Sequence, residues 1–225
     1  MRLNSIPRWQ KVIGLLVLVL VTYLSVGYLL HLVIFPEKIP AITTYFQEGD
    51  VFESKFEGLR QTVLKQENGR VHCHLDFMPY APGPPLHVHT RFDELFENGS
   101  KPLSLIVDSD TVTLKPYEKL RIPKGVPHKP FNNTGDSIAI GMKDFAFPEE
   151  FAFYLNQVYG YLDESPENMQ PPGILLQMSM FNQYFDSYLP ENGPIPVQKT
   201  IGFVIVPLAR LLGYKSYYSK FDPKR

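Results

Sequence analysis

The chain has 225 residues, enough for one ordinary domain with a buried core plus an appendage, or for two small domains at most. Its formal net charge is −1 at pH 7, and no lysine and arginine cluster is large enough to follow a phosphate backbone, so nucleic acid is not an expected partner. Cys73 is the only cysteine, which excludes an internal disulfide and a cysteine-rich zinc site. Any metal ligands must therefore be His, Asp or Glu.

An apolar segment covers residues 12–35 and contains no Asp, Glu, Lys or Arg. A helix needs about 20 such residues to cross the hydrocarbon core of a bilayer, so residues 12–35 predict a transmembrane helix. A cleaved signal peptide is the competing interpretation. It would have an apolar core of about 7 to 15 residues followed by a small-residue cleavage site, and neither is seen. The segment therefore predicts an uncleaved signal anchor.

Basic residues before this segment set its expected orientation. Three of them precede the span, namely Arg2, Arg8 and Lys11, whereas Lys38 follows it among three acidic residues. By the positive-inside rule, residues 1–11 are expected in the cytoplasm and the rest of the chain on the outer side of the cell membrane. The chain is thus expected to be a single-pass membrane protein with an extracytoplasmic body.

A short linker, residues 36–46, leads to a region of β signals that covers residues 47–147. Runs of Val, Leu and Phe are interrupted by turn-forming residues at 67–69 and at 108–110, which predict two hairpins. Short strands with a turn about every 8 to 12 residues are typical of an all-β sandwich or barrel. The body is therefore predicted to be mainly β.

Two His-x-His pairs occur in this region, and a strand would place both imidazoles of such a pair on one face. His72 and His74 form the first pair. The positions alternating with them are apolar: Val71, Cys73, Leu75 and Phe77. Since the apolar set should take the interior, the first pair and Asp76 are expected on the outer face. A ligand role for this pair stays open, because one sequence does not establish strand register.

The second pair, His87 and His89, follows the turn-forming residues Pro-Gly-Pro-Pro. Glu94 comes five residues after His89, a spacing that returns a carboxylate on the next strand. A fourth donor, His128, follows a Pro-x-Gly turn in the sequence IPKGVPHKPFN. Three imidazoles and a carboxylate suit a divalent first-row ion, so these four residues predict a metal site. The alternative is a polar barrel interior without metal.

These two segments, G-x-x-x-H-x-H-x-x-x-x-E and P-x-G-x-x-H-x-x-x-N, resemble the two conserved motifs of the cupin superfamily, whose members are double-stranded β-helix barrels of the jelly-roll group. Every defined position of the second motif is matched, by Pro123, Gly125, His128 and Asn132. In the first motif the spacing between Gly83 and His87 is shorter than usual. Asn98-Gly99 likewise follows a shorter run, and Lys115-Pro116-Tyr117-Glu118 stands where a turn glycine usually precedes the second motif. These departures concern turns and not ligands.

The resemblance covers residues 47–147 and implies a cupin-type barrel with a metal site inside it. The implied ligands are His87, His89, Glu94 and His128. Iron, manganese, nickel, copper and zinc are not distinguished by this donor set. Asp93 is expected to point away from the metal, with a role as a hydrogen-bond partner of a ligand left open. Three phenylalanines near the ligands, Phe92, Phe96 and Phe131, favour a small planar or apolar substrate.

Beyond the barrel, the apolar spacing changes to that of helices. Residues 149–162 predict one helix, and a second is predicted between prolines from residue 174 to residue 188, with its apolar face formed by Ile174, Met178, Phe181, Phe185 and Tyr188. Residues 148–225 are thus expected to be a helical extension packed on the barrel, similar to the tails of some bacterial single-barrel cupins. A last apolar run, residues 201–213, contains Pro207 and is too short to span a bilayer. It predicts a buried or interfacial helix, and a membrane-resting position stays open.

Charge is divided unevenly in this extension. Residues 144–198 carry eight acidic side chains and no lysine or arginine, while residues 199–225 carry six basic side chains and Asp222. We expect the two stretches to pair or to form solvated surface. Contact between the basic, Tyr-rich end and lipid headgroups is the alternative.

The leading functional hypothesis is a membrane-anchored cupin that binds a divalent metal and acts on a small molecule as a dioxygenase, isomerase or lyase. A redox-active metal could bring dioxygen to a substrate, whereas zinc would act only as a Lewis acid. The alternatives are a non-catalytic cupin that binds or senses a small ligand or metal, and a structural barrel without metal. Catalytic residues are not assigned by the sequence. The expected partners are a small molecule and the membrane, and a homodimer stays open because exposed barrel edges often pair.

Overall fold

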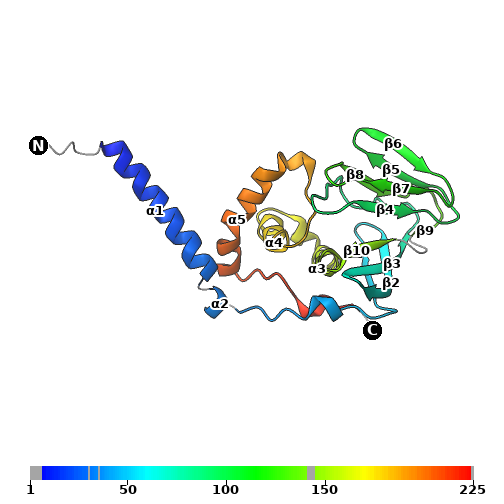
Figure 1. The fold of residues 1–225 in the computed structure, drawn as a ribbon, viewed down its shortest axis with the longest axis horizontal. Coiled ribbons are helices and arrows are strands. Elements are labelled where there is room, and N and C mark those ends of the chain that lie inside the picture. The colour runs from blue at the N-terminus through cyan, green and yellow to red at the C-terminus, as the bar shows by residue number, and fades with distance from the viewer. Residues whose placement is uncertain (1–6, 30, 35, 141–144, 224–225) are drawn as a thin grey trace, which may run out of the picture.

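The computed structural model describes residues 7–29, 31–34, 36–140 and 145–223. The chain begins with helix α1 (Arg8–Leu29), followed by one helical turn, α2 (His31–Ile34). Figure 1 shows α1 projecting away from the rest of the protein, which it meets near its C-terminal end. The segment Arg8–Ile34 is long and apolar enough to cross a membrane, a criterion of length and composition that a signal sequence can also meet.

Antiparallel strands form the body and lie in two groups. In the first group the order is β1 (Val51–Ser54), β2 (Leu59–Glu67), β3 (Arg70–Phe77) and β10 (Ala146–Pro148), and β9 (Ile138–Ile140) also pairs with β3. The second group contains a three-stranded sheet of β6 (Asp110–Leu114), β5 (Leu103–Val107) and β8 (His128–Phe131), and a pair of β4 (Glu94–Glu97) and β7 (Lys119–Ile122). An isolated bridge between Asn98 and Ile140 connects the two groups.

Local sequence explains the hairpin between β2 and β3. Asn68 and Gly69 have φ values of 52° and 73°, the positive values that a two-residue type I′ turn requires. In β3 the apolar residues are buried, with exposed fractions of 0% to 4%, while His72 and His74 lie on the other, half-exposed face. The predicted register of this strand is therefore confirmed. The second predicted hairpin is also present, between β5 and β6.

The space between the two groups of strands is filled by one apolar core. It includes Phe77, Phe96, Leu105 and Ile140, and it continues into the aromatic residues of helix α3 (Glu149–Glu164). Helix α3 contacts β1, β3 and β10 and buries ten of its residues, because phenylalanine and tyrosine recur along it at helical spacing. This helix closes one side of the strand body.

Helices α4 (Gly173–Phe181) and α5 (Ile195–Leu211) pack on each other, and α5 also contacts α1. In Figure 1, α5 lies between α1 and α4. Their shared core is small and consists of Leu176, Met180, Val206 and Ala209. The remaining helical turns are of the 3-10 type: η1 (Ile42–Thr44), η2 (Pro166–Met169), η3 (Pro190–Asn192) and η4 (Ser219–Phe221).

The second predicted helix of the extension is shorter than the expected residues 174–188. Helix α4 ends at Phe181, and the apolar residues Phe185 and Tyr188 are buried in an irregular segment. Tyr188 exchanges two backbone hydrogen bonds with Val88, of 2.9 and 3.1 Å. The segment leaves the helix because its backbone pairs with the strand body instead.

The linker of residues 36–46 is attached to the C-terminal segment. Tyr45 and Phe46 are 5% exposed and belong to the main core, and the Tyr45 hydroxyl donates to Asp222 at 2.6 Å. The Glu37 carboxylate accepts a hydrogen bond from the Ser216 backbone N–H at 3.0 Å. The expected pairing of the acidic and basic stretches is represented, within the described residues, by the ion pair of Glu164 with Lys220.

Candidate metal centre

The two predicted motifs meet through their backbones. His87 and His128 form an antiparallel bridge, in which each backbone N–H donates to the carbonyl of the other residue, at 3.0 and 2.9 Å. His128 is the first residue of β8. The segment with the first pair of histidines is less regular than predicted, since His87 and Val88 lie in isolated bridges and His89 lies outside any strand. Cross-strand pairing nevertheless places the first and last ligands side by side.

Glycine permits close approach at both motifs. Gly83 has a φ of 68°, and a Cβ atom there would lie 1.9 Å from the Pro130 carbonyl oxygen. Gly125 has a φ of 86° and donates its N–H to the His89 carbonyl at 2.8 Å. Other residues rarely adopt these backbone angles, so the two glycines allow the motifs to pack directly on one another.

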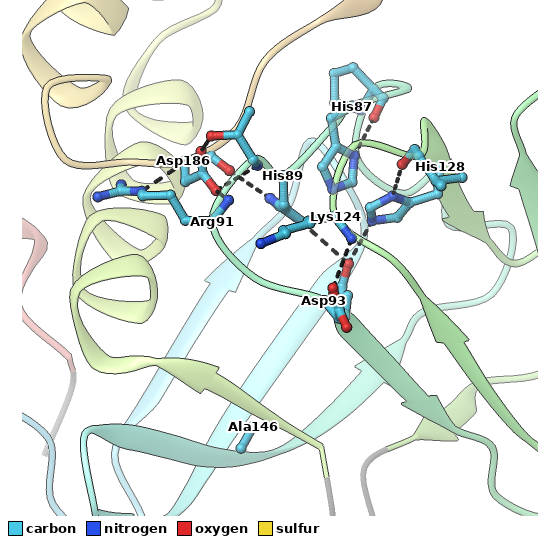
Figure 2. A network of polar contacts seen from close by, with 12 residues as sticks. His87, His89, Arg91, Asp93, Lys124, His128, Ala146 and Asp186 are labelled. Atoms are coloured by element: carbon cyan, nitrogen blue, oxygen red, sulfur yellow. Dashed lines mark hydrogen bonds and ion pairs between the residues drawn. The ribbon is translucent and has the colours of Figure 1, made fainter.

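The four predicted ligands converge in the structure. One donor atom from each of His87, His89, Glu94 and His128 lies within 4.8 Å of the others. All four side chains are buried, with exposed fractions of 1% to 8%. Figure 2 shows the three imidazoles close together, each arriving from a separate position in the backbone. Within the described residues, His72 and His74 take no part in such a cluster, as expected, and His74 lies beside Asp76 at 3.2 Å.

Backbone carbonyls orient all three imidazoles. The Nδ1 atoms of His87, His89 and His128 lie 2.9, 2.6 and 3.0 Å from the carbonyl oxygens of Pro85, Asp186 and Val126. A carbonyl oxygen only accepts, so each Nδ1 carries the proton. Each Nε2 is thereby the atom turned toward the centre of the cluster. Metal-bound histidines are commonly held in this way, with the second nitrogen donating to a carbonyl or carboxylate.

Glu94 and His128 form an ion pair at this centre. Glu94 Oε2 lies 2.6 Å from His128 Nε2 and 3.4 Å from His89 Nε2. Burial alone would raise the pKa of Glu94, but the hydrogen bond with His128 and the nearby His89 imidazole lower the pKa below its ordinary value. Burial opposes the charged form of His128, and the contact with Glu94 overcomes this and raises the pKa. The carboxylate is therefore ionised and stabilises a positive charge beside it.

His87 is held in the neutral form. Burial, and then the neighbouring His89 and His128, lower the pKa of His87 to about 3. A neutral imidazole with a protonated Nδ1 offers a free lone pair at Nε2, which is the form that binds a metal.

The donor set fits a divalent cation. His89 Nε2 is buried and has no hydrogen-bond partner in the described part of the chain, an arrangement that costs free energy unless something binds there. A cation at the centre would satisfy this atom and replace the proton shared by Glu94 and His128. Three nitrogen donors and one oxygen donor are typical ligands of divalent first-row metals.

Asp186 is a residue of the site that the sequence did not indicate. Its carboxylate is 2% exposed and accepts hydrogen bonds from the backbone N–H groups of Thr90 and Arg91, at 2.7 and 2.6 Å, and from the Thr90 hydroxyl at 2.6 Å. Its backbone carbonyl accepts from His89. Figure 2 shows Asp186 beside His89 and Arg91. The residue was missed because it lies in the segment that was predicted to be helical, far from the motifs in sequence.

Two other expectations near the ligands are resolved by the structure. Asp93 points away from the metal centre, as expected, and accepts hydrogen bonds from Arg121 and from the Lys124 backbone N–H at 2.9 Å, so it stabilises a turn. Phe92 stacks on His89 with ring centroids 4.4 Å apart, and Phe96 lies near His128. Phe131 does not line the cavity beside the site.

A cavity of about 960 Å³ adjoins the metal centre. Its lining includes His87, His89 and Glu94, and much of its apolar wall comes from the C-terminal extension, including Phe151, Leu155, Val158, Ile174, Met178 and Phe185. The apolar faces of the extension were expected to pack on the barrel. They belong to the core and also face the cavity, a double role that helical spacing cannot indicate.

A buried carboxyl group, Glu57, lines the same cavity. Burial raises the pKa of Glu57 to about 8, although a hydrogen bond from the Tyr159 hydroxyl works in the opposite direction. Its Oε2 atom is buried and has no hydrogen-bond partner among the described residues. Glu57 is therefore mainly protonated at neutral pH and can donate a hydrogen bond or a proton.

Partial matches to this chain occur among solved structures. No protein-family model matches the chain, and no curated protein matches it either. Among solved structures, KdgF from a Halomonas species matches with 16% identity and a TM-score of 0.36, over 44% of this chain and 94% of that one. A cupin-2 domain protein from Shewanella frigidimarina matches with 25% identity and a TM-score of 0.32, over 39% and 78% of the two chains.

A third solved structure, a sugar phosphate isomerase of the cupin superfamily from Silicibacter pomeroyi, matches with 16% identity and a TM-score of 0.34, over 46% and 72% of the two chains. The likeness to a cupin-type barrel is carried by the residues of this chain. Both motifs, the paired sheets and the buried cluster of three histidines and one glutamate point the same way. The strand body of this chain resembles a cupin-type barrel in its motifs, its sheets and its buried cluster.

Proposed function

We propose that this protein is a membrane-anchored cupin that binds one divalent metal ion and acts on a small molecule in the adjoining cavity. The observation that carries the proposal is the convergence of four buried donor atoms within 4.8 Å, three of which belong to residues that line that cavity. The apolar helix of residues 8–34 supports the anchor. The basic residues before it support a cytoplasmic N-terminus and a body on the outer side.

When bound, a divalent ion would supply a Lewis acid and, with a redox-active metal, a centre for dioxygen chemistry. The residues of the chain supply the rest. Three backbone carbonyls hold the imidazoles in the orientation that presents Nε2. Apolar rings lie against two of the imidazoles, those of Phe92 and Phe151 against His89 and that of Phe96 near His128, and they reduce the water contact of these ligands. Exclusion of water strengthens the electrostatic contacts that a substrate oxygen would make.

Of the reaction classes open to such a site, Glu57 favours those that transfer protons. Its carboxyl lines the same cavity as the ligands and carries a proton at neutral pH, since its pKa is about 8. A group of this kind is suited to general acid catalysis, which isomerases and lyases require. A dioxygenase does not need it. We therefore place an isomerase or lyase ahead of a dioxygenase.

Metal analysis tests the site. The full chain, purified in detergent without added metal and then exposed to one metal at a time, should hold close to one ion per chain. His128→Ala and Glu94→Ala should lose that ion while keeping their circular dichroism. His74→Ala is the matched control, because it removes a half-exposed histidine of the first pair. An unloaded parent protein, or retention of metal in both ligand variants, would contradict the proposal.

Turnover separates the enzyme from a binding protein. A panel of dicarbonyl and phenolic compounds is incubated with the metal-loaded chain in D₂O, with oxygen uptake and deuterium incorporation followed together. Incorporation or conversion without oxygen uptake is expected for an isomerase or lyase. Oxygen uptake would instead indicate a dioxygenase. Binding without either change would favour the non-catalytic cupin.

A further inference from the structure

The cavity beside the metal centre extends to the junction of α1 and α5. Its lining includes His87 and Glu94 on the strand body and also Tyr28 on α1 and Ile201 and Phe203 on α5. In Figure 1, α3 and α4 lie between α5 and the strands, and residues of both helices line the cavity. One continuous space thus connects the predicted membrane segment with the metal ligands.

The wall between these two ends is mostly apolar, with Ser179, Asn182 and Gln183 as polar residues near α4. One face of α3 lines the cavity through residues spaced four, three and four positions apart: Phe151, Leu155, Val158 and Leu162. Ile174 and Met178 of α4 add to it. Polar side chains at the strand end are three of the metal ligands and Glu57, together with Gln61, Arg91 and Tyr159. A ligand that fills this space would have a long apolar part and a polar, oxygen-bearing head.

Backbone groups at the junction are satisfied by tyrosines of α1. Pro207 has no N–H, which leaves the Phe203 carbonyl without its usual helical donor, and the Tyr28 hydroxyl donates to this carbonyl at 2.8 Å. The Tyr23 hydroxyl accepts from the Leu208 N–H at 3.2 Å and donates to the Val204 carbonyl at 2.9 Å. Broken helices are tolerated within lipid when neighbouring helices satisfy their backbone in this way. The junction is therefore suited to an apolar surrounding.

The two helices also pack closely. A Cβ atom on Gly27 would lie 2.3 Å from the Pro207 Cβ, and the rings of Tyr28 and Phe203 stack with centroids 4.8 Å apart. A membrane position for α1 therefore brings this part of α5 to the membrane as well.

An apolar stripe continues from this junction along α5. Val197, Ile201, Leu208 and Leu211 share one face at helical spacing, and they are 43% to 71% exposed. The Leu208 backbone N–H also donates to the Tyr23 hydroxyl of α1, so α1 lies against α5 within the length of this stripe. A helix of 17 residues is too short to span a bilayer, but an exposed apolar face allows it to lie in the interface.

We infer that the cavity receives an amphipathic, lipid-borne substrate from the outer leaflet of the membrane. The molecule enters where α1 meets α5, its apolar chain lies along α3 and α4, and its oxygen-bearing head reaches the metal ligands. This inference rests on the proposed function, because it requires both the anchor and the metal site. It adds the chemical class of the substrate and the route by which it enters.

Binding of chelating probes tests the substrate class. The full chain in phosphatidylcholine vesicles is loaded with cobalt, and its visible spectrum is titrated with dodecanehydroxamic acid and with acetohydroxamic acid. The long-chain probe should bind at least about tenfold more tightly, because each buried methylene adds to affinity. Val158→Trp and, as a second variant, Ile174→Trp should remove this preference by filling the cavity. Val112→Trp, at an exposed position outside the cavity lining, should retain it.

The possible results have separate meanings. Equal affinity of the parent chain for the two probes overturns the inference and leaves the metal site intact. The same holds if the cavity variants prefer the long-chain probe as strongly as the Val112→Trp control does. Absence of cobalt from the parent chain overturns the proposed function, and this inference with it. Cobalt content and circular dichroism of each variant show that it is folded.

Quenching of fluorescence by brominated lipids tests the entry route. Trp9 is the only tryptophan, so Trp9→Phe provides a background without fluorescence from this residue type. In that background, Ile201→Trp should be quenched by brominated phosphatidylcholine, and Val112→Trp should not be. Equal quenching at the two positions overturns contact of α5 with lipid. Quenching of Trp9 in the parent reports on the anchor separately, and its absence would overturn the anchor and the entry route together.

Discussion

His87 and His128 exchange two backbone hydrogen bonds, and their imidazole rings lie with centroids 4.4 Å apart. The backbone pairing and the ring contact have the same origin, because residues directly opposite on antiparallel segments place their side chains on one side. The metal centre is therefore part of the sheet pairing. Changes that disturb this pairing should affect the fold and the metal site together.

Asp186 should control the position of His89. Replacement by Ala leaves the partly buried N–H groups of Thr90 and Arg91 without their acceptor, so the free energy of unfolding should fall by about 1 to 3 kcal/mol. Metal affinity should also fall by about 10 to 100-fold. Urea denaturation and cobalt titration of the full chain measure the two effects.

Asp163→Ala is the matched control for Asp186→Ala. Asp163 also accepts from two backbone N–H groups, those of Lys55 and Phe56, but it lies away from the ligands. This variant should lose stability and keep its metal affinity. If both variants lost metal to the same extent, Asp186 would have no specific role in positioning His89.

Gly83→Ala should destabilise the fold and weaken metal binding. The new Cβ would meet the Pro130 carbonyl oxygen at 1.9 Å, and Pro130 lies on β8, which begins with His128. Gly49→Ala is the control, because Gly49 has a similar positive φ of 88° and no neighbour within 4 Å of an added Cβ. The control should cost about 1 to 2 kcal/mol from its backbone angle alone. A larger loss of stability for Gly83→Ala than for Gly49→Ala, measured by denaturation, would be due to the close contact with the Pro130 carbonyl. Equal losses of stability would show that this contact has no effect.

Glu57 should make stability depend on pH. The pKa is raised to about 8 in the folded state, above the unfolded value, so the folded state holds the proton more tightly. The stability from this group is complete below the unfolded pKa and is lost as pH rises to about 8, by at most about 1.4 kcal/mol per pH unit. Glu57→Gln removes this dependence. The free energy of unfolding of the variant, minus that of the parent, should therefore increase between about pH 4.5 and 8. Above pH 8 this difference should stay constant.

Denaturation of both proteins across this pH range provides the measurement. Glu48→Gln, at an exposed position, controls for the removal of one negative charge. Parallel stability curves for the parent and Glu57→Gln would show that this carboxyl is not buried as a neutral acid.

Cys73 should be unreactive in the folded protein. Its side chain is 0% exposed, and burial raises the pKa of the thiol to about 12, so the thiolate that reacts is scarce at neutral pH. Because the chain has one cysteine, labelling with iodoacetamide followed by mass spectrometry reads this position alone. Label should appear only after unfolding in urea. Rapid labelling under native conditions would be inconsistent with the assigned face of β3.

Tyr28 should stabilise the contact between α1 and α5 through the carbonyl that Pro207 leaves free. Tyr28→Phe removes the hydroxyl that donates to Phe203, at an expected cost of about 1 to 3 kcal/mol. In a Pro207→Ala background the restored N–H can satisfy this carbonyl, so the same change should cost less. A double-mutant cycle from thermal unfolding of the full chain in detergent should give a coupling of about 1 kcal/mol. Additive effects would show that the hydroxyl and the proline act independently.

Sequence reasoning was reliable where the physical constraint was local. The alternation of Val71 and Cys73 with His72 and His74 gave the correct face for each, because side chains in a strand alternate. The helix of residues 149–162 was recognised within two residues of its observed end, because its aromatic residues repeat at helical spacing. The helix predicted for residues 174–188 was wrong beyond Phe181, since pairing of Tyr188 with Val88 overrides a local pattern.

By itself, the sequence determined the candidate ligands, the apolar segment of residues 12–35 and the mainly β body. These features depend on residue types at short spacings, which a single segment displays. Only the tertiary structure decided that the four donor atoms meet and that Asp186 orients the segment carrying His89. It also decided that α5 packs against α1, and that a cavity extends from this contact to the metal centre. Such contacts join residues that are far apart in the chain. They depend on backbone pairing and on the packing of whole helices and strands, and no single stretch of sequence contains a pattern that indicates them.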